Sequence, residues 1–268
     1  MLFKCLDDST MYYRTLGIIL RRRDYRESDG LFSIYTRDRG KIEAIAKGVK
    51  KIKSKLGPHL DYFAVIDLML ARGKSFYQLA GATVIKNFSG IKTELRKISL
   101  ASYCLEIVDI LQKEGQKDEA IWRLLKELLE ILDRSSSDKD EIFLVRIFSL
   151  KLLSHLGYAP ELYNCLVCQR KILPKGNIFV PQRGGLVCGE CQKKSVGIKG
   201  EKISTDAIKV LRLILEKEQK ELLKIKMKEE VLGEVISIID SFVALHLERE
   251  PKTKKWLAFF GVDKKKKV

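Results

Sequence analysis

The sequence predicts an α+β protein: an N-terminal barrel of five strands, then an all-α helical domain with a four-cysteine zinc segment inserted in it. Three observations lead to this fold class. Short apolar runs rich in β-forming residues, separated by turn signals, occupy the first part of the chain. Helical periodicity occupies the rest. Four of the six cysteines gather between two of the helical stretches.

Five candidate strands lie between residues 11 and 87. The run TLGIIL at Thr15–Leu20 is apolar and rich in β-formers. Two alternating runs, Gly30–Thr36 and Lys41–Gly48, flank the turn sequence RDRG and predict a hairpin. The runs AVIDLMLA and FYQLAGATVI flank RGK in the same way. Five short strands predict a small barrel or sandwich, and the five-stranded Greek-key barrel is the OB fold, which binds oligonucleotides.

Helical periodicity begins after Ser89, with apolar residues at three- and four-residue spacing. The first two helices are expected over Leu95, Ile98, Ala101, Leu105, Val108 and Leu111, and over Ile121, Leu124, Leu125, Leu128 and Leu132. A third helix, Glu141–Leu156, is apolar on nearly every side, so we expect it to be buried, with Gly157 as its C-cap. Two more helices follow, one N-capped by Ser204 and one over residues 228–248.

These changes of pattern set the expected domain boundaries. We expect an OB-fold DNA-binding domain at residues 11–87 and a helical domain at 88–260, which contains the zinc segment at 160–197. Residues 1–10 are expected to be an N-terminal extension, to which no role is assigned. The lysine-rich residues 261–268 are expected to form a frayed basic tail.

The cysteines form two Cys-x-x-Cys pairs with nineteen residues between them: Cys165, Cys168, Cys188 and Cys191. Each pair places two sulfurs within reach of one ion, and the spacing is typical of zinc sites. Four thiolates leave no open coordination position, so the zinc is expected to be structural. Ligand type alone leaves an iron–sulfur cluster open, whereas a thioredoxin-like redox site needs only one such pair.

Positive charge is concentrated in the predicted barrel. The whole chain has 51 Lys and Arg against 35 Asp and Glu, a net charge of +16. Residues 11–87 hold 16 basic and 7 acidic residues, so 16 − 7 = +9 of the excess lies in this segment. Such clustering indicates a polyanionic partner such as nucleic acid. The candidate DNA-binding residues are Arg21, Arg22, Arg23, Arg37, Arg39, Lys41, Lys47, Lys50, Lys51, Lys53 and Lys55.

Aromatic residues are interleaved with these cations. Tyr25, Phe32 and Tyr35 are candidates for stacking on bases. Packing in the barrel core is the alternative for Phe32 and Tyr35, and the sequence leaves both readings open.

Several functional classes lack their signals. The sequence GKS at Gly73–Ser75 resembles a phosphate loop, but Leu68 stands where that motif requires glycine, so no nucleotide site is expected. The three histidines are scattered and no catalytic set appears, so no enzyme is expected. The apolar run Tyr62–Ala71 is too short and too charged to cross a bilayer, and the start lacks a signal-peptide pattern. We therefore expect a cytosolic protein without structural disulfides.

The segment GIILRRRDYRESDGLFSIYTRDRGKIEAIAKGVKK, followed later by LLSHLGYAPELYNCLVC, resembles the RecO family of bacterial recombination mediators. The resemblance covers roughly residues 12–250. It implies a non-enzymatic protein of recombinational DNA repair, the RecFOR pathway, that binds single- and double-stranded DNA without sequence specificity. It also implies annealing of complementary strands, including strands coated by single-strand-binding protein, and loading of RecA with the help of RecR, without ATP.

The resemblance further implies where partners are bound. Family DNA contacts correspond to basic barrel positions such as Arg21, Arg22, Arg23, Arg37, Arg39, Lys47, Lys50 and Lys51. The family binds the C-terminal tail of single-strand-binding protein at least partly through its helical domain, and zinc occurs in many members. It implies a cytoplasmic, nucleoid-associated location.

Two alternative hypotheses remain open from the residues alone. A sequence-specific regulator would read DNA with its zinc ribbon, through polar and basic side chains such as Gln169, Arg170 and Arg183. A metalloenzyme would need an open coordination position on the metal.

Overall fold

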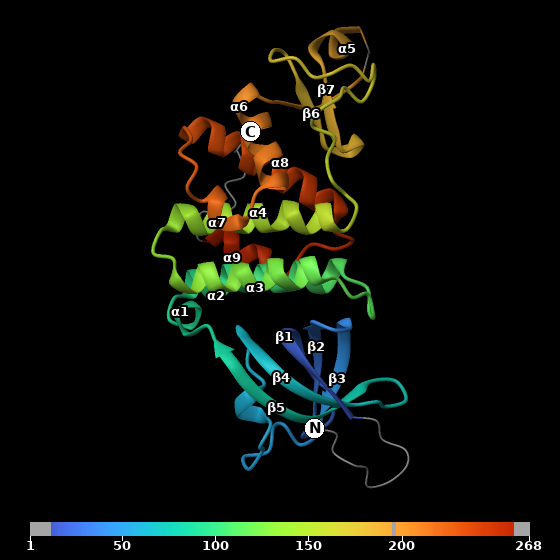
Figure 1. Ribbon diagram of the computed structural model, residues 1–268, viewed down its shortest axis with the longest axis vertical. Coiled ribbons are helices and arrows are strands. Elements are labelled where there is room, and N and C mark those ends of the chain that lie inside the picture. Colours follow the sequence, from blue (N-terminus) through green and yellow to red (C-terminus); the bar gives the residue numbers. More distant parts are fainter. Residues whose placement is uncertain (1–11, 195–196, 260–268) are drawn as a thin grey trace. The chain divides into compact units, whose positions relative to one another are not determined.

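The computed structural model describes residues 12–194 and 197–259, which form the strands and helices of Figure 1. Contacts divide the chain into two compact units, one ending at Leu129 and one beginning at Glu130. The predicted fold class is confirmed, because a five-stranded barrel precedes a helical region that contains a four-cysteine cluster. The predicted boundary between residues 87 and 88 remains a prediction. The proposed extension (1–10) and basic tail (261–268) lie outside the described residues.

The barrel strands are β1 (Tyr12–Asp24), β2 (Gly30–Thr36), β3 (Gly40–Ala46), β4 (Ala64–Ala71) and β5 (Tyr77–Asn87). They close in the order β1-β2-β3-β5-β4, with β3 and β5 parallel and the other pairs antiparallel. The short 3-10 helix η1 (Gly57–His59) lies between β3 and β4 in the chain. Apolar residues of all five strands, among them Ile19, Phe32 and Ile66, fill the interior. The arrangement is that of an OB barrel.

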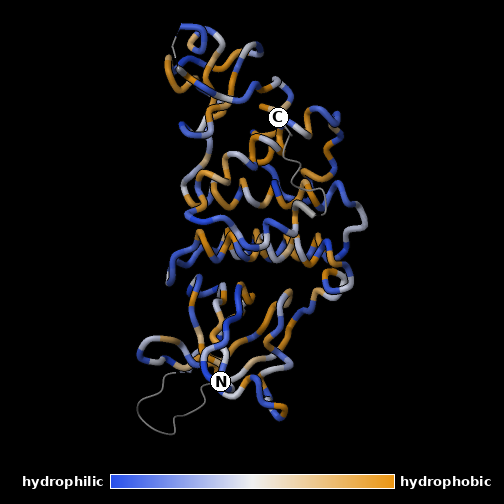
Figure 2. The backbone as a smooth tube through the Cα atoms, turned by 180° about the vertical axis from the view of Figure 1, so that it is seen from behind, coloured by the Kyte–Doolittle hydropathy of each residue, from blue (hydrophilic) through white to orange (hydrophobic). Residues whose placement is uncertain are grey.

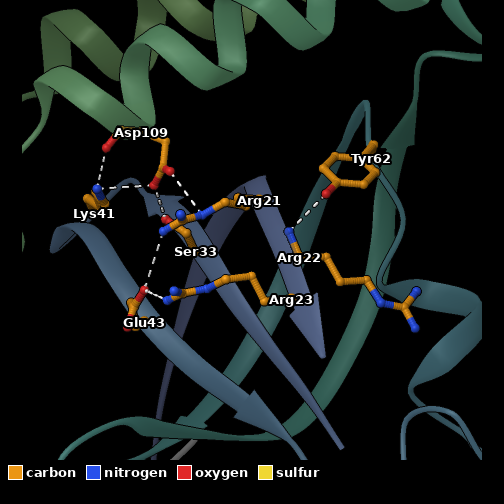
Figure 3. A network of polar contacts seen from close by, with 8 residues as sticks. All are labelled: Arg21, Arg22, Arg23, Ser33, Lys41, Glu43, Tyr62 and Asp109. Carbon is orange, nitrogen blue, oxygen red and sulfur yellow. Dashed lines mark hydrogen bonds and ion pairs between the residues drawn. The ribbon is translucent and has the colours of Figure 1, made fainter. Parts of the chain in front are cut away.

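A β-bulge in β1 determines how the three consecutive arginines point. The pairing of β1 with β2 shifts between Ile19 and Arg21, so that Arg21 lies opposite Ser33 and Arg23 opposite Leu31. Successive side chains of a strand point to opposite faces. Arg21 and Arg23 therefore share one face of β1, and Arg22 lies on the other (Figure 3).

Strand β2 is buried along its whole length, because both of its faces are covered. Phe32 and Ile34 belong to the barrel core, and the intervening Leu31, Ser33 and Tyr35 are buried as well. The first unit also contains α1 (Ser89–Lys92), α2 (Leu95–Leu111) and the start of α3 (Glu119–Arg134), and α2 packs against β1. The barrel is therefore packed together with helical residues that follow it in the chain.

The second unit is built around α4 (Asp138–His155), which packs against α6 (Thr205–Glu216), α7 (Gln219–Leu222) and α8 (Glu229–His246). Most of α4 is buried, as its sequence predicts. The expected caps are present: the Ser204 side chain accepts a hydrogen bond from the Ala207 N–H, and Gly157 adopts a φ of 88°. Figure 2 shows hydrophobic stretches along the strands and helices of both units. The last helix is α9 (Lys254–Phe259).

The cysteine segment contributes short elements to the second unit: β6 (Ile178–Val180), η2 (Pro181–Arg183), β7 (Gly185–Val187), α5 (Gly189–Lys194) and β8 (Glu201–Lys202). The three strands form a sheet in the order β7-β6-β8. Within residues 12–194 and 197–259, no helix has both the length and the apolar character required to span a bilayer.

Candidate nucleic-acid interface and metal site

The basic face of the barrel is largely occupied by ion pairs within the first unit. Asp109, on the last turn of α2, has a side chain only 2% exposed. Its carboxylate accepts a hydrogen bond of 2.6 Å from the Ser33 hydroxyl. It lies 3.1 Å from Arg21 Nε and 3.1 Å from the Lys41 ammonium, which also donates to the Asp109 carbonyl (Figure 3). Two predicted DNA-contacting cations are thus neutralised by one buried acid.

The other two arginines of the RRR run differ from each other. Arg23 pairs with Glu43 at 2.6 Å, and Arg21 lies 3.7 Å from the same carboxylate. Arg22 points away from this network (Figure 3), and its guanidinium lies 5.6 Å from the Phe32 ring centroid. Its backbone N–H donates to the Tyr62 hydroxyl at 2.8 Å. No ion pair engages Arg22 within the described part of the chain, so it is available to solvent anions.

The tip of the β2–β3 hairpin packs against the connection between α2 and α3. Arg37 pairs with Glu119 at 3.4 Å, and the Arg39 guanidinium lies 4.3 Å from the Tyr13 ring centroid. A Cβ on Gly40, whose φ is +65°, would lie 1.9 Å from the Gln116 carbonyl oxygen. Only glycine fits there, and the hairpin tip is therefore part of the packing of this unit.

The segment KGVKKIKSK, residues 47–55, forms a loop between β3 and η1 that we call the lysine loop. Lys50 lies 2.8 Å from Asp24, and its ammonium lowers the pKa of that carboxyl through a hydrogen bond. The remaining lysines are exposed and have no ion-pair partner among the residues that the structure describes: Lys47, Lys51, Lys53 and Lys55. Of the predicted DNA-contacting cations, these four, Arg22 and Arg39 have no partner of opposite charge among the described residues, and Arg39 lies against the Tyr13 ring instead.

A second basic loop was missed by the sequence analysis. The β4–β5 turn carries exposed Arg72 and Lys74, and the ring of the following Phe76 lies edge-on to Tyr25, with centroids 6.1 Å apart. Arg26 places its guanidinium 5.4 Å from the Tyr25 ring centroid. The GKS sequence that resembles a phosphate loop therefore lies in the predicted hairpin turn. The sequence feature that could have revealed this basic loop is the pair of cations at the turn, Arg72 and Lys74.

The β1–β2 loop joins these two basic loops. Its Asp29 side chain accepts from the Gly48 N–H at 2.8 Å, and the Ser28 carbonyl accepts from the Lys50 N–H at 3.0 Å. Tyr25 in the same loop contacts Phe76 on the other side. The lysine loop, the β1–β2 loop and the β4–β5 turn therefore lie next to each other at one edge of the barrel.

Two of the three aromatic candidates are core residues. Phe32 and Tyr35 are fully buried, and Tyr35 donates from its hydroxyl to the Asp118 carbonyl at 3.1 Å. Burial raises the pKa of the Tyr35 hydroxyl well above its ordinary value. Of the two alternatives that the sequence left open for Phe32 and Tyr35, the structure supports packing in the core, because strand β2 is covered on both faces. Tyr25 alone of the three is exposed.

The four cysteines meet as the spacing predicts. The Sγ atoms of Cys165, Cys168, Cys188 and Cys191 all lie within 4.8 Å of one another. The Cys168 and Cys188 sulfurs are 3.9 Å apart, close to the edge of about 3.8 Å in a tetrahedron with metal–sulfur bonds of about 2.3 Å. The residues present thus fit a four-coordinate metal ion, and all four positions would be filled by protein.

The electrostatics of the cluster also fit a cation. Burial opposes ionisation of Cys165, but backbone N–H donors outweigh it and lower its pKa to about 6; the donors from Val167 and Cys188 each lie 3.4 Å from Sγ. Burial and the adjacent sulfurs raise the pKa of Cys191 to about 12. Four neighbouring sulfurs cannot all carry charge by themselves, whereas a bound divalent cation stabilises all four thiolates.

The side chains considered for sequence reading occupy exposed positions, and Arg170 also forms a side-chain hydrogen bond with the Cys168 sulfur of the cluster. Arg170 lies 3.6 Å from Glu190, with both side chains largely exposed. Gln169 adopts a φ of 59° in the turn, and Arg183 is exposed at the end of η2. A Cβ on Gly189 would lie 2.7 Å from the Gly176 carbonyl oxygen, so this glycine is needed where two backbone segments approach closely.

Together, the closed five-stranded barrel, its cationic loops and the four-cysteine cluster define a class of OB-barrel proteins with a ribbon-type metal-binding segment. Two family models match the chain, and both describe the same family. The model described as recombination protein O N terminal matches residues 11–88, and that described as recombination protein O C terminal matches residues 92–255. The chain belongs to the RecO family of DNA repair proteins.

Curated relatives match over nearly the full length. A DNA repair protein RecO of Dehalococcoides mccartyi is 35% identical over 245 residues, covering 91% of this chain and 94% of the relative. The RecO of Clostridium perfringens is 32% identical over 244 residues, covering 91% and 96%. That of Alkaliphilus metalliredigens is 29% identical over 239 residues, covering 89% and 95%. The resemblance seen in the sequence is confirmed.

Proposed function

We propose that this chain is a non-enzymatic DNA-binding protein of recombinational repair that binds single- and double-stranded DNA without sequence preference and anneals complementary strands. One observation supports this above the others. Four exposed lysines on one loop of an OB barrel have no acidic partner among the described residues, in a chain whose relatives are DNA repair proteins. When unpaired cations bind phosphates, counterions condensed on the DNA are released, and this release gives affinity without base recognition.

The DNA-binding surface that we propose is narrower than the one predicted from sequence. Its central part is Lys47, Lys51, Lys53 and Lys55, with Arg22, Arg26, Arg72 and Lys74 as further phosphate contacts. The other sequence candidates, Arg21, Arg23, Arg37, Arg39, Lys41 and Lys50, act first within the fold, through the acids and the tyrosine ring described above. A phosphate would have to compete with those partners to engage them.

Annealing follows from how such a surface holds a strand. Phosphate contacts position a strand without reading its bases, so the pairing edges stay free for a complementary strand. Neutralised phosphates also repel those of the incoming strand less, which lowers the barrier to close approach of two polyanions. We propose that RecR is the partner with which the chain helps load RecA, and that it binds the C-terminal tail of single-strand-binding protein; family membership supports both.

We propose zinc as the metal held by the cysteine cluster, with a structural role. Cys165, Cys168, Cys188 and Cys191 would hold it, and when bound it supplies folding free energy to a segment with a small apolar core. The buried aliphatic side chains of this core are Ile178, Val180 and Val187, and such a small core gains stability from a bound metal.

The test is the salt dependence of single-strand binding by the full-length protein. A variant with Lys47, Lys51, Lys53 and Lys55 changed to Ala is compared with a control in which four exposed lysines of the second unit, Lys220, Lys224, Lys226 and Lys228, are changed to Ala. Both variants lose the same charge. The slope of log K against log salt should become shallower by up to about 2.8 in the first variant, about 0.7 per lost phosphate contact, and stay unchanged in the control.

Annealing of strands coated with single-strand-binding protein is measured on the same three proteins, with and without RecR. We expect slower annealing by the lysine-loop variant alone. Equal slopes and equal annealing rates in both variants would show that only total charge matters and that the proposed surface is wrong. Wild-type protein that neither binds single strands nor anneals them would contradict the function itself.

A further inference from the structure

We propose that Ile52 is an apolar wedge that the lysine loop inserts between neighbouring bases of bound DNA. The inference rests on the DNA-binding function proposed above and names the contact that the loop makes beyond the phosphates. It assigns a base-contacting role to an aliphatic residue at the centre of a basic loop.

The exposure of Ile52 is the first observation. Its relative exposure is 104%, so its side chain is covered by no other part of the described chain. The next large apolar side chains are less exposed: Leu173 at 70%, Leu95 at 60% and Ile85 at 59%. Single exposed apolar residues are common on protein surfaces, so exposure by itself indicates nothing. The residues around Ile52 indicate what its exposed side chain binds.

The loop backbone is fixed on both sides of Ile52. On one side the Lys51 N–H donates to the Gly48 carbonyl at 3.1 Å, and Val49 is buried in the barrel core. On the other side the Ser54 N–H donates to the Lys51 carbonyl at 2.9 Å, and the Gly57 N–H donates to the Ser54 hydroxyl at 3.1 Å. A residue held outward by an ordered loop loses little conformational freedom on binding, which favours insertion.

The charges around Ile52 select the ligand. Lys51 and Lys53 flank it directly, and Lys47 and Lys55 lie at the ends of the same loop, all exposed and free of ion pairs within the described residues. Phosphates drawn to these lysines bring a nucleic-acid backbone against the loop, with its bases next to the apolar side chain. Apolar wedges, including Ile, enter between base steps and partially unstack them.

An aliphatic wedge also suits annealing. The Ile52 side chain has no hydrogen-bonding group, so it contacts the faces of bases and not their pairing edges. Such a contact is independent of sequence, because every base offers an apolar face. It interrupts stacking within one strand while the pairing edges remain open to another.

An anionic membrane surface is the competing ligand, because basic segments with an apolar anchor also bind lipid headgroups. The basic residues next to the lysine loop favour DNA over lipid as its ligand. The β1–β2 loop connects it to Arg26, Arg72 and Lys74, and thus to a longer cationic edge on a barrel of the oligonucleotide-binding type. The relatives of the chain are DNA repair proteins.

The experiment uses a single-stranded oligonucleotide carrying 2-aminopurine, whose fluorescence rises when it unstacks. The full-length wild type is compared with Ile52→Ala, with Ile52→Leu, and with Ile85→Ala as an exposed isoleucine on β5 of the same barrel. We expect wild type, Ile52→Leu and Ile85→Ala to raise the fluorescence alike. For Ile52→Ala we expect at least a threefold smaller rise at saturation and an affinity lower by about fivefold, with the same salt slope.

The possible outcomes distinguish a failure of the wedge proposal from a failure of the proposed DNA-binding function. Because the Ile52 side chain is fully exposed in the described part of the chain, Ile52→Ala should melt at the wild-type temperature, so a changed signal cannot be ascribed to unfolding. A full fluorescence rise with Ile52→Ala would overturn the wedge and leave the lysine contacts intact. Binding to phosphatidylglycerol vesicles that Ile52→Ala abolishes, with an unchanged DNA signal, would overturn it in favour of lipid. Failure of the wild type to bind DNA would instead refute the proposed function.

Discussion

Asp109 is expected to stabilise the first unit far more than an ordinary surface acid. Its buried carboxylate faces Lys41, whose side chain is 12% exposed, and Arg21, whose side chain is 33% exposed. Breaking a buried ion pair by removing one partner costs about 3–5 kcal/mol, since the other charge stays desolvated. Water reaches Arg21 in part, so we expect Asp109→Asn to lower the free energy of unfolding by about 2–4 kcal/mol.

Tryptophan fluorescence can measure this loss in the relevant unit. The chain has two tryptophans; Trp122 is buried in the first unit, whereas Trp256 is half exposed in the second. In a Trp256→Phe background, urea unfolding followed by fluorescence therefore reports on the unit that contains Asp109. This choice also avoids treating a chain of two units as a single two-state transition.

A surface ion pair of the same barrel provides the matched control. Asp67 lies 2.7 Å from Arg14, whose side chain is 71% exposed, so Asp67→Asn should cost less than about 1 kcal/mol. Adding Lys41→Met to Asp109→Asn should recover part of the loss, because a missing pair costs less than an unpaired buried charge. Equal losses from Asp109→Asn and Asp67→Asn, or no recovery in the double variant, would refute the idea that Asp109 is a buried counter-ion for both cations.

Other predictions concern the hairpin tip, the barrel core and the metal site. Gly40→Ala should lower the free energy of unfolding in the same urea assay by about 2 kcal/mol or more, because its Cβ would clash with the Gln116 carbonyl; a loss below about 0.5 kcal/mol would contradict the packing described. Burial raises the pKa of the Tyr35 hydroxyl, so the stability that the neutral side chain contributes is present below about pH 10 and is lost as the pH rises further. Between about pH 9 and pH 11, the melting temperature of the wild type should therefore fall more than that of Tyr35→Phe, and equal falls would contradict this. Cys165→Ser, or metal removal by a chelator, should lower the melting temperature and leave single-strand affinity of the folded protein within about twofold. A well-folded metal-free variant that no longer binds DNA would contradict a purely structural metal, and a cobalt-substituted protein without a four-thiolate spectrum would contradict the ligand set.

The local features of the fold were predictable because their signals are local. Alternating apolar residues around RDRG and RGK predict two hairpins, and both are present between β2 and β3 and between β4 and β5. The cysteine pairs carry their geometry in their spacing, and their sulfurs do come together. The short helices α1, α5 and α7 were not predicted, since helices of four to six residues leave almost no periodic pattern.

The basic surface was harder to predict, because charge compensation is set by contacts between distant residues. Lys41 and Asp109 are 68 residues apart in the chain, and Arg37 and Glu119 are 82 apart. Both acids lie outside the segment whose charge was counted, so a net charge of +9 overstated how many cations were free. The bulge after Ile19, which turns Arg21 toward Asp109, has no sequence signature either.

The buried outer face of β2 has a consequence for how the barrel acquires its structure. Its covering residues, including Asp109 and Asp118, are translated well after the last strand ends at Asn87. A nascent chain that has emerged only as far as Asn87 would hold all five strands but no counter-ion for Lys41 and no acceptor for the Tyr35 hydroxyl. On the ribosome, the barrel should therefore remain exchange-labile until the first turn of α3 has appeared. A fragment cut where strands give way to helices would stay in that unfinished state.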